Sequence, residues 1–207
     1  MKSSRTMWIS AAAIGLVTSA AAAQTNISAS KHNFTSYAWS NNEICLPCHT
    51  PHKAISGQIR LWNHSLTEAT YTLKLKNGSS TGTAIADLDS KSRLCLSCHD
   101  GTVALDSFGG GGSGGGAGMD PTIRANLGTD LSNDHPVGSR ATWPPQYATS
   151  YHPTPVGLSL VKWNNGTTEV DVVGCTTCHN PHKGVDEQYL LKKTNSGSAL
   201  CLSCHIK

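Results

Sequence analysis

The sequence has little of what a protein needs to build a large hydrophobic core. Only 38% of its 207 residues are hydrophobic, 6% are aromatic and 14% are charged. Much of the hydrophobic share is an alanine-rich stretch near the start, and the rest lies below the apolar content of an ordinary globular domain. A large core made of side chains alone is therefore excluded. Either another group supplies the apolar centre or the chain is disordered.

The chain also lacks an apolar run that is long enough to span a membrane. Its longest such run, residues 8–23, is shorter than the about 20 residues that a spanning helix requires. This run follows two basic residues and ends in Ala21-Ala22-Ala23, which is typical of a secretory signal with its cleavage site. We predict a signal peptide at residues 1–23 and an exported chain over residues 24–207, with no membrane insertion.

No block of like charge is present that would indicate a nucleic-acid partner. The formal net charge is +3, with 16 basic and 13 acidic side chains. Two of the basic residues, Lys2 and Arg5, lie in the predicted signal peptide, so the exported chain is nearly balanced. Nucleic acid is therefore not an expected partner.

No cysteine lies outside one repeated pattern. Eight cysteines in an exported chain would ordinarily suggest four disulfides. Here every cysteine belongs to a Cys-x-x-Cys-His unit (CXXCH). The four units are Cys45-Leu-Pro-Cys48-His49, Cys95-Leu-Ser-Cys98-His99, Cys175-Thr-Thr-Cys178-His179 and Cys201-Leu-Ser-Cys204-His205.

This pattern is the attachment signature of c-type haem. Two thiols on a helical turn form thioethers with the vinyl groups, and the adjacent histidine becomes the proximal iron ligand. A structural zinc site would need clusters of four Cys or His ligands, and a thioredoxin-like site would need one pair in a βαβ unit. The sequence therefore predicts four covalently bound haem c groups, whose faces supply the missing core.

Six histidines remain as candidates for the distal position on each iron, whereas only Met119 remains as a methionine candidate after the signal peptide. All four haems can therefore be bis-histidine ligated, with low reduction potentials. A proline directly precedes His52 and His182 and argues against a continuing helix there. Each of these two histidines can therefore turn away from its own motif. The favoured candidates are His32, His52, His64, His135 and His182, and His152 is disfavoured. Because five candidates exceed four sites, at least one has another role or serves a neighbouring molecule.

The motifs form an internal repeat. Cys-x-x-Cys-His-x-Pro-His-Lys is followed by Leu-Cys-Leu-Ser-Cys-His, and the same order then recurs. This indicates a duplicated two-haem unit, with halves at about residues 24–105 and 170–207 of a single domain. The glycine-rich stretch within residues 106–120 is predicted to be a flexible loop. A phosphate-binding reading is disfavoured because no strand precedes the stretch and no Lys-Ser/Thr follows it.

Little regular structure is expected elsewhere. Residues 71–76 alternate as a strand does, and residues 158–163 and 169–173 flank an Asn-Asn-Gly turn as in a short hairpin. The predicted fold class is mostly irregular, with short α-helices at the haem sites and a minor β-hairpin. Such a chain would wrap around a haem stack.

The segments around the motifs resemble the doubled-CXXCH multihaem cytochromes. They are most similar to the tetrahaem subgroup that includes the extracellular filament-forming (nanowire) cytochromes of metal-reducing bacteria. The segments that carry this resemblance are Ser30-Lys31-His32, Cys48-His49-Thr-Pro-His52, Leu61-Trp62-Asn63-His64, residues 94–104, residues 130–137 and residues 200–205. The resemblance implies the same five distal histidines, and the polyglycine stretch is a departure from it.

The expected function is electron transfer, because six-coordinate irons leave no position for a substrate. The chain is therefore not expected to be an enzyme. The resemblance further implies a conductive filament, with other copies of the chain, redox partner cytochromes and extracellular acceptors such as metal oxides as partners. The alternatives are a monomeric periplasmic electron shuttle and a small oxyanion reductase with one open haem. The expected location is an extracellular filament or the periplasm.

Overall fold

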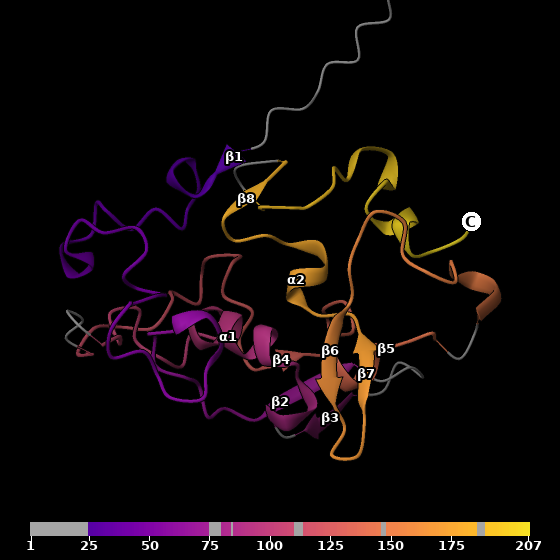
Figure 1. The fold of residues 1–207 in the computed structure, drawn as a ribbon, viewed down its shortest axis with the longest axis horizontal. Helices are drawn as coiled ribbons and strands as arrows, with labels where there is room; N and C mark the ends of the chain where they lie inside the picture. Colours follow the sequence, from indigo (N-terminus) through magenta and orange to yellow (C-terminus); the bar gives the residue numbers. More distant parts are fainter. Residues whose placement is uncertain (1–24, 75–79, 84, 110–113, 146–147, 186–188) are drawn as a thin grey trace, which may run out of the picture.

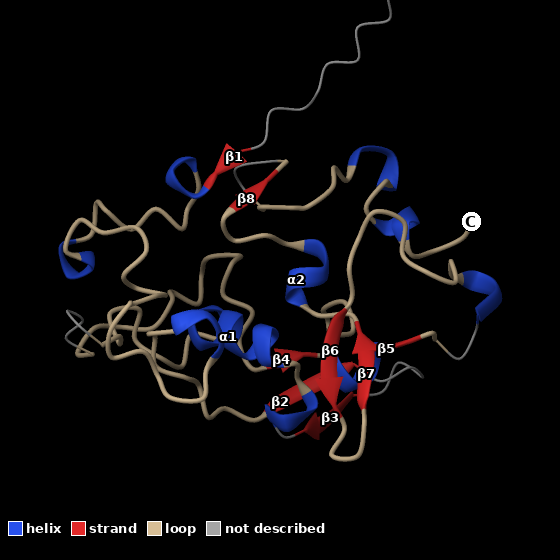
Figure 2. Ribbon diagram, in the orientation of Figure 1, coloured by secondary structure: helices blue, strands red, loops and turns tan. Residues whose placement is uncertain are grey.

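Short elements joined by long loops make up most of the fold (Figure 1, Figure 2). The computed structural model describes residues 25–74, 80–83, 85–109, 114–145, 148–185 and 189–207. The predicted signal peptide and positions 110–113 of the glycine-rich stretch lie outside these residues. Within the described ranges, no helix is long and apolar enough to cross a membrane.

The first small sheet has the strand order β3-β2-β4. Strand β2 (Tyr71–Lys74) is antiparallel to β3 (Ser80–Thr83) and parallel to β4 (Asp130–Leu131). Along β2, Tyr71 and Leu73 are buried and alternate with half-buried residues, as expected for a strand that covers a core with one face. The strand predicted at residues 71–76 therefore exists over its first four residues, and the last two lie outside the described residues.

The second sheet contains the hairpin that the Asn-Asn-Gly turn predicts. Strands β6 (Val161–Asn164) and β7 (Glu169–Val172) pair antiparallel, and β5 (Thr142–Trp143) joins the other edge of β7. The Asn165 side chain accepts hydrogen bonds from two backbone N–H groups of the turn, and Gly166 takes a φ of +91°. A turn with φ above zero favours glycine, which explains the position of this residue.

A third pairing and two helices complete the regular elements. Strand β1 (Thr25–Asn26) is antiparallel to β8 (Lys183–Gly184), and the helices are α1 (Ser90–His99) and α2 (Cys175–Cys178). The Asp89 side chain caps α1 by accepting hydrogen bonds from two backbone N–H groups of its first turn. Single 3₁₀ turns occupy Ile27–Ala29, Ala38–Ser40, Ile59–Leu61, Ile85–Asp87, Gly138–Ala141, Ala148–Ser150, Ser196–Ser198 and Cys201–Ser203.

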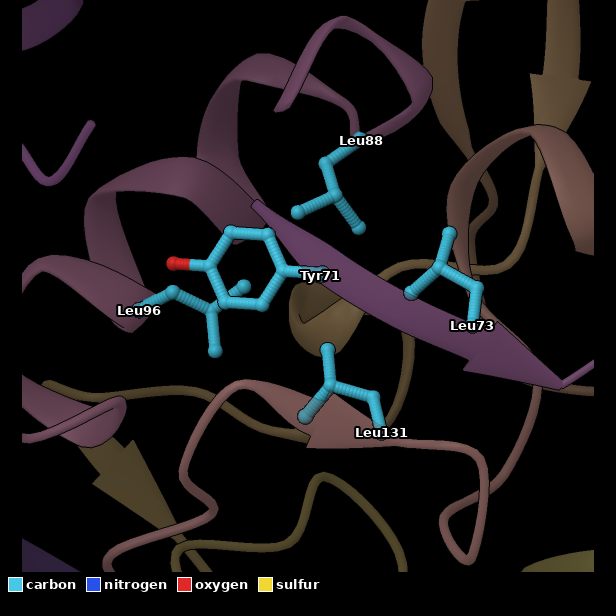
Figure 3. Packing of buried hydrophobic residues seen from close by; sticks show 5 residues of the cluster. All are labelled: Tyr71, Leu73, Leu88, Leu96 and Leu131. Atoms are coloured by element: carbon cyan, nitrogen blue, oxygen red, sulfur yellow. The ribbon is translucent and has the colours of Figure 1, made fainter. Parts of the chain in front are cut away.

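The hydrophobic cluster is small. It packs α1 against the first sheet through five buried side chains, shown in Figure 3: Tyr71, Leu73, Leu88, Leu96 and Leu131. The Tyr71 hydroxyl donates a hydrogen bond to the Asp100 carboxylate, which is also buried, at 2.6 Å. A cluster of this size agrees with the low apolar content of the sequence.

Replacing Tyr71 by phenylalanine is expected to lower the free energy of unfolding by about 1–3 kcal/mol. The buried carboxylate of Asp100 would lose a donor at 2.6 Å that water cannot replace. Chemical denaturation of the purified protein measures this change. Tyr37→Phe is the matched control, because the Tyr37 side chain is 52% exposed and should change stability by less than about 0.5 kcal/mol. Equal effects of the two variants would contradict the argument.

Candidate haem-binding site

Each CXXCH motif forms one tight turn. In three motifs the backbone N–H of the histidine donates to the carbonyl of the first cysteine, at 2.8 Å for His49, 3.0 Å for His179 and 3.0 Å for His205. In the second motif the same residues form the end of α1. The two cysteines are three residues apart, so such a turn places them on one face. This is the arrangement that attachment to two vinyl groups requires.

The predicted short α-helices occur at only two of the four motifs. The second motif lies on α1 and the third on α2, whereas the first is a hydrogen-bonded turn and the fourth begins a 3₁₀ helix. The chain before the first motif takes left-handed conformations at Asn41 and Asn42, and the chain before the fourth does so at Gly197 and Ser198. Left-handed residues interrupt an α-helix, so neither motif continues a helix that begins before these residues.

Three of the four CXXCH histidines share one hydrogen-bonding arrangement. The Nδ1 atoms of His49, His99 and His179 each lie within hydrogen-bonding distance of a backbone carbonyl. The acceptors are the oxygens of Arg60, Ala125 and Tyr189, at 2.8, 2.8 and 2.7 Å. A carbonyl only accepts, so Nδ1 carries the proton and Nε2 keeps its lone pair for a metal. These acceptors lie 10 to 26 residues away, beyond the reach of any sequence motif.

Three of the four CXXCH histidines face a second histidine. The ring centroids are 5.9 Å apart for His99 and His32, 6.0 Å for His49 and His182, and 6.4 Å for His205 and His135. Metal–imidazole bonds are about 2 Å long, so two imidazoles on opposite sides of one metal ion have centroids roughly 6 Å apart. The three distances therefore fit pairs of axial ligands.

The remaining candidates are not brought to such a position. His52 is exposed, and His179 faces no second histidine ring in the part of the chain that the structure describes. His64 is buried, and its Nε2 lies 3.5 Å from Cys98 Sγ of the second motif. His152 donates its backbone N–H to the Cys204 carbonyl, and its ring faces none of the described histidines.

Burial keeps several of these imidazoles neutral. It lowers the pKa of His32 to about 4, and the neighbouring His99 adds to this effect. Burial is also the main cause of the lowered pKa values of His64, His182 and His205. A histidine binds metal in its neutral form, so at neutral pH these side chains need lose no proton to become ligands.

The cysteine side chains of consecutive motifs lie near one another. Burial, followed by the charge of Cys48, raises the pKa of Cys98, and burial and Cys204 together raise the pKa of Cys178. Between the second and third motifs, a hydrogen bond joins the thiols of Cys95 and Cys175 and raises the pKa of Cys95. The attachment points thus follow one another in the order of the sequence.

These residues fit haem c. Each motif presents two thiols and an imidazole on one turn, and three motifs also present a second imidazole at the separation of an opposite ligand. The residues that would hold the group are therefore the eight cysteines, the four CXXCH histidines and their partners His32, His135 and His182. Haem would supply an iron that cycles between two oxidation states.

Comparison with known proteins agrees with this chemistry. Residues 169–207, which contain the third and fourth motifs, match the family model described as the doubled CXXCH motif. No curated protein matches the chain. The CXXCH motifs indicate covalently bound haem c, and the doubled motif supports a multihaem c-type cytochrome that takes part in electron transfer.

Proposed function

We propose that the chain is a tetrahaem cytochrome that passes electrons along a row of closely spaced, bis-histidine ligated haems outside the cytoplasm. One observation carries this proposal. Three CXXCH histidines each face a second imidazole, with ring centroids 5.9 to 6.4 Å apart. An iron with two imidazole ligands has no open position for a substrate. The group can then exchange electrons but cannot bind a reactant, so the chain acts as a carrier and not as an enzyme.

The proximity of the motifs supports a continuous path. Cys48 lies near Cys98, Cys95 is hydrogen-bonded to Cys175, and Cys178 lies near Cys204. Because each thiol is an attachment point at the edge of a haem, the haems would follow one another in motif order. Electrons would then enter at one end of the row and leave at the other.

The proposal extends to a homopolymer. His179 faces no second histidine among the described residues, and His52 is exposed without a facing ring. In the repeat, His182 follows the third motif but faces His49 of the first, so this position serves an iron outside its own motif. By the same logic, His52 follows the first motif and would serve the third motif of a neighbouring copy.

Ligation across copies would join the haem rows into a conductive filament. In such an assembly, contact with redox partner cytochromes and with extracellular acceptors such as metal oxides would occur at the exposed ends and edges. His32 is a less suitable bridge than His52, because its ring lies 5.9 Å from that of His99 in the same chain.

The incomplete third site also favours a second candidate. If no neighbouring copy supplies a ligand to the iron at His179, that iron has one open position. A small oxyanion could bind there and be reduced, with the other haems delivering electrons. A monomeric electron shuttle is the case in which another histidine of the same chain fills this position.

Haem content and spin state test the proposal. We expect four haems per chain by pyridine haemochrome assay and intact-mass analysis, and wholly low-spin iron in assembled material by electron paramagnetic resonance. Dispersed monomers should show one high-spin haem in four, because the bridging ligand is lost. Fewer than four haems would contradict the tetrahaem assignment. High-spin iron that persists in assemblies would favour the reductase, and wholly low-spin monomers would favour the shuttle.

A further inference from the structure

The helices that carry the second and third motifs, α1 and α2, are in contact (Figure 1). A buried polar joint, formed by Asp89 and Ser92, connects them. Asp89 is 1% exposed, and its carboxylate accepts hydrogen bonds from the Lys91 and Ser92 backbone and from the Ser92 hydroxyl. The Ser92 Oγ in turn accepts the backbone N–H of Cys175 at 3.0 Å. A single chain of hydrogen bonds therefore runs from the cap of α1 to the first residue of α2.

Gly174 lets the two helices approach each other closely. Its backbone is extended, with a φ of −132°, so any residue could adopt this conformation. A Cβ atom at this position would nevertheless lie 3.0 Å from Asp89 Cγ and 2.7 Å from Val161 Cγ2. These separations are too short for carbon atoms, which pack at about 3.5–4.0 Å. Glycine is therefore required at position 174 because Asp89 and Val161 lie so close, and not because of its backbone conformation.

The joint lies between the two halves of the repeat. Cys95 belongs to the last motif of the first half and Cys175 to the first motif of the second half, and their thiols are hydrogen-bonded. Cys95 lies on α1, six residues beyond the N-cap Asp89, and Cys175 directly follows Gly174. The spacing at the joint therefore controls the spacing of the two attachment points.

We propose that Asp89, Ser92 and Gly174 set the approach of the haems bound at the second and third motifs, and so set the rate of electron transfer between the two-haem halves. This inference rests on the proposed function. The three are positioning residues, because none of them is a cysteine or histidine of a motif. They act through the packing of α1 against α2, and electron transfer slows steeply as the distance between two carriers grows.

Gly174→Ala tests the joint in the full-length, haem-loaded protein. The added methyl group should force α1 and α2 apart while leaving all eight cysteines and all histidines in place. We expect four haems with the spin states of the unmodified protein, weaker magnetic interaction between haems, and several-fold slower electron equilibration after rapid partial reduction. Gly115→Ala is the matched control, because a Cβ there meets nothing within 4 Å. This control should behave as the unmodified protein does.

A second variant, Ser92→Ala, tests the same joint if the Gly174→Ala protein does not accumulate. Ser92→Ala removes the acceptor of the Cys175 N–H without adding bulk, and it should also slow equilibration. Unchanged equilibration and magnetic interaction in whichever of these variants folds with four haems would overturn the role of the joint. The proposed function fails separately, if the unmodified protein shows no electron exchange between its haems.

Discussion

Replacing both Cys175 and Cys178 by alanine is expected to abolish accumulation of the folded protein. The third motif lies in the middle of the row, with Cys95 of the second motif on one side and Cys204 of the fourth on the other. The described hydrophobic cluster of five side chains cannot hold this region together once its haem is absent. Because ligand binding and folding are coupled in such sites, the binding energy lost is folding energy. The yield of haem-stained protein and its melting temperature measure the effect.

Thr176→Ala provides the control for this prediction. Thr176 lies between the two cysteines, and its buried Oγ1 has no hydrogen-bond partner among the described residues. Removing this hydroxyl should therefore leave yield and melting close to those of the unmodified protein. A well-folded three-haem protein with unchanged melting, obtained from the double cysteine variant, would show that haem does not supply the core.

His52→Ala is expected to prevent filament formation and to leave one high-spin haem in four. His52 is exposed, and neither it nor His179 of the third motif faces a histidine ring among the described residues. One iron–imidazole bond across the interface would make assembly and ligation a single event, so its loss should remove both together. Negative-stain imaging and electron paramagnetic resonance on the same preparation measure the two effects.

Two comparison variants separate bridging from ligation within one chain. His32→Ala should give high-spin iron even in monomers, because His32 faces His99 of its own chain at 5.9 Å. His152→Ala should change neither property. If His152→Ala produces the high-spin haem and His52→Ala does not, His152 of the same chain supplies the second ligand of the iron at the third motif. Filaments of normal length after loss of each favoured histidine in turn would exclude bridging altogether.

Features that depend on neighbouring residues could be predicted from the sequence. Haem attachment needs two thiols and an imidazole on one turn, so the spacing of the CXXCH units carries the chemistry, and the match over residues 169–207 confirms the doubled motif there. The β6–β7 hairpin is equally local, because Asn165 and Gly166 favour its turn. The short α-helices expected at the haem sites occur at the second and third motifs, whereas the first motif is a hydrogen-bonded turn and the fourth begins a 3₁₀ helix.

Which groups meet across the chain depends on the packing of segments that are far apart in the sequence. His49 faces His182, more than a hundred residues away, and His32 faces His99 from the first described segment. Four CXXCH histidines and five candidate distal histidines can be paired in many ways that give each iron two ligands. The residue types alone do not distinguish these pairings. The approach of Gly174 to Asp89 is likewise absent from any local pattern. The cofactor chemistry can be predicted from the sequence because that chemistry is local. The facing histidines and the spacing of the two halves cannot, because they depend on packing between distant segments.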